Sequence, residues 1–190
     1  MSSLPKTFLT PEEYLEQERR AEFKHEYVDG EIFAMSGASR RHSLIVTNIV
    51  RELGQQLKGK GCEVHSNDLR LRIPPGRAFL YPDVMAICGE VQLADEHNDT
   101  VLNPILIIEV LSPSTRNYDQ GGKFEMYRKL PSLREYLTIS QHEQRIEHHR
   151  RIENNRWELL EVDDPSAVLQ LQSISCALPL AEIYDKVAWE

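Results

Sequence analysis

Residues 105–111 of the chain read Ile-Leu-Ile-Ile-Glu-Val-Leu, and residues 80–87 read Leu-Tyr-Pro-Asp-Val-Met-Ala-Ile. Both runs are apolar, rich in β-branched residues and bounded by turn residues, which is typical of central strands buried on both faces. Each run carries one carboxylate, Glu109 in the first and Asp83 in the second. Because an ionised carboxylate in a dry interior costs several kcal/mol unless it is paired or coordinated, the pattern indicates a metal, a salt bridge or a raised pKa.

A metal is the hypothesis that joins the two acids. Carboxylate oxygens suit Mg²⁺ or Mn²⁺, so Asp83 and Glu109 are the candidate ligands. For either acid alone, a strand-end residue that caps a loop or pairs with an arginine is an alternative. Lys123 lies on the helix predicted over residues 117–130, which leaves the same strand as Glu109. A lysine beside two metal-binding acids can position water or stabilise charge on a phosphate.

The rest of the chain predicts further strands and helices around these two runs. Asp29-Gly30 within residues 24–35 is a β-hairpin signal, and apolar residues at spacings of three and four predict a helix over residues 43–57. A short helix is expected from Thr10 to about Arg20, and strands are expected in the second half of 62–73 and in 134–140, 144–150, 156–162 and 168–171. We expect one domain over residues 1–190, of the α/β or α+β class, with a mixed sheet flanked by helices.

Composition limits the classes of function. The chain has 190 residues, 41% of them hydrophobic, and a net charge of −8, which counts against non-specific coating of nucleic acid. A nuclease remains possible if a metal inverts the local field and basic residues gather on one face, for which the candidates are Arg40, Arg41, Arg70, Arg72 and Arg77. No apolar run approaches the ~20 residues that cross a bilayer, so we expect a cytoplasmic protein without a membrane partner. The spacing of Cys62, Cys88 and Cys176 indicates buried thiols rather than disulfides or a zinc site.

An ordered set of motifs gives a resemblance to a known family. The motifs lie between about residues 10 and 150 and read Glu26-Tyr-Val-Asp-Gly-Glu31, Arg41-His42-Ser43, Tyr81-Pro82-Asp83-Val84, Ile107-Ile-Glu-Val-Leu-Ser-Pro-Ser-Thr115, Lys123 with Tyr127, and Arg134-Glu135-Tyr136. In this order they resemble the Uma family of putative restriction endonucleases, a branch of the PD-(D/E)xK nuclease superfamily. The resemblance implies a restriction-endonuclease-like core and a metal-dependent endonuclease acting on DNA. The superfamily places its lysine two residues after the second acid, where this chain has Leu111, so Lys123 looks like the lysine moved to the following helix.

Two further residues are secondary candidates. Glu31 follows the hairpin turn and could be a third acid of the site, or a solvent-facing residue. His42 could bind a metal-bound water or act as a base near neutral pH, or it could be a polar residue of a helix start. His142, His148 and His149 are not assigned to a metal, because neighbours on a strand point to opposite faces and the alternating charges fit an exposed strand.

Three functions stay open. In the leading one, the chain hydrolyses phosphodiester bonds as a Mg²⁺- or Mn²⁺-dependent endonuclease, and we expect a homodimer because symmetry lengthens the phosphate footprint. The alternatives are an inactive nuclease-fold module that binds nucleic acid or protein, and a metal-dependent phosphohydrolase of small molecules. If the first holds, Lys123→Ala should abolish cleavage with folding nearly unchanged, and Lys129→Ala should do little.

Overall fold

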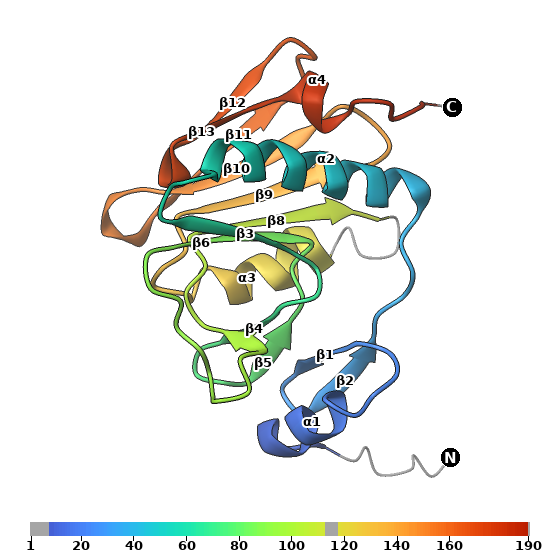
Figure 1. Cartoon of the computed structure of the whole chain (residues 1–190), viewed down its shortest axis with the longest axis vertical. Coiled ribbons are helices and arrows are strands. Elements are labelled where there is room, and N and C mark those ends of the chain that lie inside the picture. Colours follow the sequence, from blue (N-terminus) through green and yellow to red (C-terminus); the bar gives the residue numbers. More distant parts are fainter. Residues whose placement is uncertain (1–7, 113–117, 190) are drawn as a thin grey trace.

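The computed structural model describes residues 8–112 and 118–189, and its strands form two large sheets and a hairpin (Figure 1). The larger sheet has the order β11-β10-β9-β8-β6-β3, and the second has the order β2-β1-β5-β4-β7. The strands of the larger sheet are β3 (Cys62–Ser66), β6 (Val84–Cys88), β8 (Leu106–Leu111), β9 (Glu135–Ser140), β10 (Ile146–Arg151) and β11 (Trp157–Val162). Those of the second are β1 (His25–Val28), β2 (Glu31–Ala34), β4 (Arg70–Ile73), β5 (Ala78–Leu80) and β7 (Thr100–Val101), and β12 (Val168–Leu171) pairs with β13 (Cys176–Pro179).

The helices are α1 (Pro11–Glu18), α2 (Arg40–Leu57), the π-helical segment η1 (Tyr118–Lys123), α3 (Phe124–Tyr127), the 3₁₀ turns η2 (Glu153–Asn155) and η3 (Gln172–Ile174), and α4 (Leu180–Ile183). Helices α2 and α3 lie on opposite faces of the larger sheet, and α1 lies beside β1 and β2 of the second sheet (Figure 1). Parallel pairing of β8 with β9 makes the larger sheet mixed, because its other pairs are antiparallel. The predicted class, a mixed sheet flanked by helices, is therefore confirmed.

The single expected sheet is wrong, because the run over residues 80–88 divides between the two sheets. β5 ends at Leu80 and β6 begins at Val84, so the chain crosses from one sheet to the other through Tyr81, Pro82 and Asp83. Proline has no N–H to donate to a ladder, so it suits a break between strands better than the middle of one. The break places Asp83 at the beginning of β6 rather than within it.

β8 lies at the centre of the core, and its side chains point alternately into two hydrophobic clusters on opposite faces of the sheet. Leu106, Ile108 and Val110 pack with α2 and the β12–β13 hairpin, and Ile107 packs on the other side with α3 and the second sheet. All six residues of the strand are buried. The prediction of a strand covered on both faces is confirmed.

The long helix α2 buries the predicted face. Ile45, Ile49 and Leu53 are fully buried and Leu44 is partly buried. Helix α2 begins at Arg40, three residues before the predicted start at Ser43, because Ser39 caps it by accepting a hydrogen bond from the His42 N–H. Lys58 is exposed as expected, but Arg51 and Glu52 are half-buried, since they bind each other and Arg51 also reaches Glu182.

Two of the three cysteines correct the prediction of free thiols. Cys62 and Cys88 lie opposite each other on the antiparallel strands β3 and β6 and form a disulfide, whereas Cys176 is a buried free thiol. The strand register creates the pair, and sequence spacing alone does not show that register. Separately, within residues 8–112 and 118–189 no helix is both long and apolar enough to cross a membrane.

Candidate active site

Asp83 and Glu109 meet at the end where β6 begins and β8 finishes. Val84 lies opposite Ile108 on these antiparallel strands, so the next pair outward is Asp83 and Glu109, with both side chains on the same face. The Asp83 N–H donates to Glu109 Oε2 at 3.3 Å, and the Val110 N–H donates to Asp83 Oδ2 at 2.8 Å. The two acids are therefore neighbours on the α3 side of the sheet.

Lys123 reaches this pair from the end of η1. Its Nζ lies 3.2 Å from Glu109 Oε1, 3.1 Å from Glu26 Oε1 and 3.3 Å from Asp119 Oδ1. Lys123 is buried, with 7% of its surface exposed, whereas Lys129 is exposed. The Pro113-Ser114-Thr115 segment and the expected helix start at Asn117 lie outside the described residues.

Sequence reasoning missed three partners of this cluster. Glu26 of β1 and Asp119 of η1 bind Lys123, and the Tyr127 hydroxyl donates to Glu109 Oε1 at 2.7 Å. A signal existed for Asp119, which precedes Lys123 by four residues on one helical face. Glu26 belongs to a motif of the family resemblance, but its contact with Lys123 was not predictable, because only tertiary packing brings β1 to the end of η1.

Glu31 lies on the same hairpin as Glu26. It begins β2 opposite Val28, at the turn end of the hairpin, and Glu26 lies at the other end, opposite Phe33. Alternation places Glu31 and Glu26 on the same face of the hairpin. Glu26 is the acid of this hairpin that binds Lys123, and a role for Glu31 as a third acid stays a prediction.

His42 approaches the acids from α2. Its Nε2 lies 3.1 Å from Asp83 Oδ2, the oxygen that also accepts from the Val110 N–H. Burial by itself lowers the pKa of His42, but the hydrogen bond and charge of Asp83 outweigh it and raise the pKa overall. The imidazole is thus oriented by one of the two candidate metal ligands.

The cluster holds more negative than positive charge. Burial raises the pKa of Glu109 well above its usual range, and the charges of Asp83, Asp119 and Glu26 add to this, while Lys123 opposes it. Burial also acts against the ammonium of Lys123, yet its three acidic neighbours raise the pKa of Lys123 overall. Four carboxylates thus share one lysine and one histidine, an environment that favours an added cation.

The carboxylate oxygens of Asp83 and Glu109 are donors of the type that Mg²⁺ and Mn²⁺ take. In the part of the chain that the structure describes, no three histidine, cysteine or acidic side chains are grouped so that they could hold a metal ion. Magnesium commonly takes only one or two protein carboxylates and completes its shell with water and substrate phosphate. Asp83 and Glu109 satisfy that smaller requirement.

The basic face expected of a nucleic-acid binder is only partly present. Arg70 is buried against Asp99, so it cannot contribute, and this part of the prediction is wrong. Arg72 lies over the Phe79 ring, and Arg77 pairs with Asp29 at 2.6 Å. Arg40 and Arg41 are the first two residues of α2 and directly precede His42.

The prediction that the histidine-rich strand is exposed is wrong. β10 is an internal strand between β9 and β11, so it is not exposed as its charges suggested. His148 is buried and lies 3.0 Å from Glu135 Oε1, whereas His149 lies over the Phe124 ring. The two histidines face opposite sides of the sheet, and the decision not to assign them to one metal is consistent with this arrangement.

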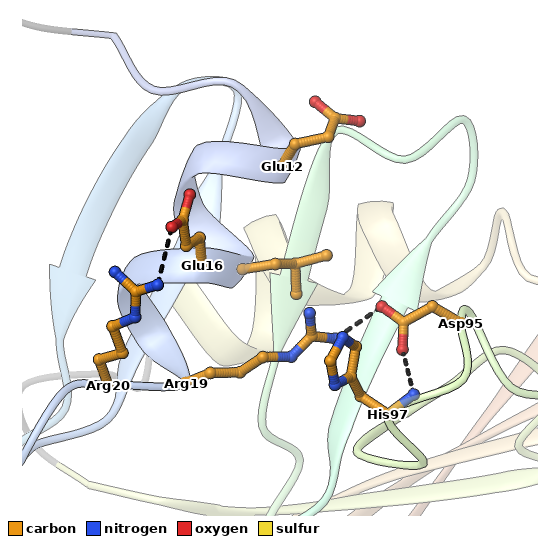
Figure 2. A pocket seen from close by; sticks show the side chains of 7 residues that line it. Glu12, Glu16, Arg19, Arg20, Asp95 and His97 are labelled. Carbon is orange, nitrogen blue, oxygen red and sulfur yellow. Dashed lines mark hydrogen bonds and ion pairs between the residues drawn. The ribbon is translucent and has the colours of Figure 1, made fainter.

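A separate cavity of about 500 Å³ lies between α1 and the loop at Asp95 and His97 (Figure 2). Its polar walls already bind one another: Arg19 lies 2.6 Å from Asp95, and the His97 N–H donates to Asp95 Oδ1 at 3.0 Å. None of the predicted site residues lines it. The acid and lysine cluster is therefore the better candidate for chemistry.

Comparison with known proteins identifies a family for the chain. A family model described as Uma2, putative restriction endonuclease, matches residues 11–181. The chain is 38% identical over 162 residues to the uncharacterized Synechocystis protein sll1609, covering 85% of this chain and 92% of that one. It is 36% identical over 187 residues to the uncharacterized Synechocystis protein slr1290, covering 98% and 97%.

A solved structure has the same fold. The crystal structure of a putative nuclease belonging to DUF820 from Anabaena variabilis superposes with a TM-score of 0.76. The match covers 95% of this chain and 99% of that chain at 19% sequence identity. At this identity, the likeness establishes the fold alone.

Proposed function

The chain belongs to the Uma2 family of putative restriction endonucleases, and from this premise we propose that it is a metal-dependent endonuclease of the PD-(D/E)xK type that hydrolyses phosphodiester bonds of DNA. One observation carries the proposal. Asp83 and Glu109 occupy one face at the ends of adjacent strands, and the ammonium of Lys123 lies 3.2 Å from Glu109. Two acids can hold a divalent ion that activates water, and a neighbouring lysine can stabilise the charge that develops on the phosphate.

Each residue then has a role that its contacts define. Asp83 and Glu109 would hold Mg²⁺ or Mn²⁺, which when bound lowers the pKa of water and screens phosphate charge. The Tyr127 hydroxyl and the Asp83 N–H fix the two oxygens of Glu109 by hydrogen bonds. Lys123 stabilises negative charge at the scissile phosphate or orients the attacking water.

His42 contributes at the solvent side of the pair. Its hydrogen bond to Asp83 Oδ2 holds that carboxylate in place and keeps the imidazole within reach of a substrate phosphate or water. Arg40 and Arg41, on the preceding residues of α2, supply positive charge toward a phosphate backbone. Glu26 and Asp119 hold Lys123 in position through their ion pairs.

One observation favours the non-catalytic alternative. Lys123 is engaged by three carboxylates, so its ammonium must exchange at least one of them for substrate before it can assist the reaction. A module that never turns over would keep Lys123 as a purely structural cation. Retention of nucleic-acid binding without cleavage in any divalent metal would identify that alternative.

Cleavage of DNA by the purified protein tests the proposal. Supercoiled plasmid and labelled oligonucleotides should be cut in Mg²⁺ or Mn²⁺ and left intact in EDTA. Asp83→Asn and Glu109→Gln should each lower the rate by at least about 100-fold, the order of loss seen when a single electrostatic contributor to catalysis is removed. Full activity in either variant would exclude this site. Hydrolysis of nucleotides or sugar phosphates in place of DNA would favour a small-molecule phosphohydrolase.

We also propose that the nuclease acts as a homodimer. A chain of net charge −8 gains a longer phosphate footprint when two copies bind one DNA molecule. Light scattering at micromolar concentration should give twice the mass of the chain. A strictly monomeric species that cleaves DNA at full rate would contradict this part of the proposal.

A further inference from the structure

Two large aromatic side chains remain exposed beside the acid and lysine cluster. Phe33 of β2 is 49% exposed, and Tyr118 at the start of η1 is 38% exposed. They come from different elements, the N-terminal hairpin and the helical segment after β8. Exposed aromatic faces beside a phosphodiester-cleaving centre are the groups on which unpaired nucleobases stack.

The hairpin register places Phe33 on the side of the site. Phe33 lies directly opposite Glu26 in the antiparallel pair β1–β2, and direct partners project from the same face. Glu26 extends from this face to Lys123, whose Nζ is 3.1 Å away. The opposite face, with Tyr27, is the one that packs with Tyr14 of α1 and Phe79. Phe33 therefore projects beside Glu26 at the outer rim of the cluster.

Tyr118 lies beside Lys123. The centroid of its ring lies 5.8 Å from Lys123 Nζ. A Cβ at Gly122 would lie 2.9 Å from Tyr118 Cδ2, so glycine at this position lets the ring rest on the helical turn. Burial, followed by the charge of Glu26, raises the pKa of Tyr118 to about 12, so the ring is uncharged at neutral pH and does not repel phosphate.

The electrostatics of the protein make stacking the more useful source of affinity. A duplex is gripped mainly through phosphates by arginine and lysine. Three of the candidate arginines already contact other residues of the protein: Arg70 pairs with Asp99, Arg72 lies over the Phe79 ring, and Arg77 pairs with Asp29. With a net charge of −8, the chain has few cations to offer two phosphate strands at once.

We propose that Phe33 and Tyr118 stack unpaired bases next to the scissile phosphodiester, so that the substrate is single-stranded DNA or DNA opened at the cut site. This inference rests on the proposed endonuclease function and adds the form of its substrate. Tyr118 contacts Lys123 directly and Phe33 lies opposite Glu26, which binds Lys123, so unpaired bases next to a phosphate held at Asp83 and Glu109 have two rings to contact. Paired bases are already stacked in a duplex and cannot use these rings.

Binding of matched oligonucleotides tests the inference without turnover. The probes are a fluorescein-labelled oligothymidylate, the same oligonucleotide with abasic sites at its centre, and its duplex with oligoadenylate, measured by anisotropy in Ca²⁺. We expect the single strand to bind more tightly than the duplex. The abasic probe should lose roughly 5- to 150-fold in affinity, the range for stacking on an aromatic side chain.

Ring variants separate stacking from general attraction. Phe33→Ala and Tyr118→Ala should each weaken binding of the intact single strand at least roughly 5-fold and should reduce the penalty of the abasic probe, whereas Tyr118→Phe should retain affinity. Phe8→Ala is the matched control, because Phe8 is 62% exposed and packs on Gly30 at the turn end of the same hairpin. Circular dichroism and thermal unfolding should show that all four variants fold.

Several results would overturn the inference. Equal binding of the intact and abasic strands, tighter binding of the duplex, or wild-type affinity in both ring variants would each exclude base stacking. Binding restricted to an oligouridylate ribonucleotide would exclude DNA as the partner. Cleavage assays in Mg²⁺ separate failure of this inference from failure of the proposed function. If a duplex is cut as fast as a single strand and neither ring variant changes the rate, base stacking is refuted but the nuclease function is retained. If no nucleic acid is cut, the nuclease function itself is refuted.

Discussion

Replacement of Lys123 by methionine should destabilise the metal-free protein strongly. Methionine keeps most of the apolar stem but removes the ammonium, which lies 3.1–3.3 Å from Glu26, Glu109 and Asp119. Because Lys123 is only 7% exposed, solvent cannot replace it for these carboxylates. Loss of one partner from a buried ion pair costs about 3–5 kcal/mol. For a chain of this length, that lowers the thermal midpoint by about 6–20 °C, at about 2–4 °C for each kcal/mol.

The dependence on pH and on metal should identify the cause. The charge of Lys123 lowers the pKa of Glu109 by stabilising the ionised carboxylate, so its removal raises the pKa further and destabilises the folded protein while Glu109 is ionised. The stability deficit of Lys123→Met should therefore shrink as pH falls and the orphaned acids take up protons. Mg²⁺ should stabilise the variant more than the wild type, because the carboxylates of the cluster carry more uncompensated negative charge once the Lys123 ammonium is removed.

Urea unfolding in EDTA at several pH values, with Lys129→Met as the exposed control, measures this prediction. The control should stay within about 0.5 kcal/mol of the wild type. A Lys123→Met protein as stable as the wild type at neutral pH would refute the reasoning, because the three ion pairs would then contribute nothing. The burial of Lys123 also changes the expectation drawn from sequence, in which its loss left folding nearly intact.

Three other perturbations have defined outcomes. Glu109→Gln should gain thermal stability relative to wild type in EDTA as pH rises from about 5 to 8. Burial raises the pKa of Glu109, so ionisation of this acid above its ordinary pKa disfavours the folded state of the wild type. Mg²⁺ should make the wild type the more stable protein, and a stability difference that stays constant across pH would contradict the prediction. The hydrogen bond from Arg19 holds the pKa of Asp99 at about 2, so Asp99→Asn should cost roughly 1 kcal/mol at pH 7 after allowance for solvent screening. That cost should disappear as pH falls from about 4 to 2, and acid unfolding curves that stay apart below pH 2 would exclude the ion pair as its source. Ile49→Ala should cost about 2–5 kcal/mol in urea unfolding, because Ile49 is fully buried between α2 and the sheet, and a loss below about 1 kcal/mol would show that the helix is not docked there.

Local patterns predicted those parts of the fold that local forces decide. Asp29 and Gly30 both have positive φ, at 50° and 96°, as a two-residue hairpin turn of the type read from the sequence requires. The face of α2 followed from its apolar spacing, because one helix buries one stripe. β8 followed from an apolar run that only a sheet covered on both faces can accommodate.

Features that depend on contacts between distant segments of the chain could not be predicted from the sequence. Glu26 reaches Lys123 only because the hairpin packs against the end of η1, which no spacing within either segment encodes. β10 looks like an exposed strand by its charges, yet β11 covers its edge and Glu135 pairs with His148 inside the protein. Asp83 and Glu109 were accessible to sequence reasoning because a carboxylate inside an apolar run is rare enough to require an explanation. Their shared face depended on a strand register that sequence did not supply.

The most direct test of the central claim is a crystal structure of the protein soaked in Mn²⁺, with the anomalous signal used to locate the metal. We expect a peak at the ends of β6 and β8, with one carboxylate oxygen from Asp83 and one from Glu109 at about 2.0–2.2 Å, close to the distances that small divalent ions adopt with oxygen ligands. Lys123 should remain beside Glu109. An ordered Asp83 and Glu109 without a peak at saturating Mn²⁺, or an ion bound away from both carboxylates, would contradict the assignment of this cluster as the metal centre of a nuclease.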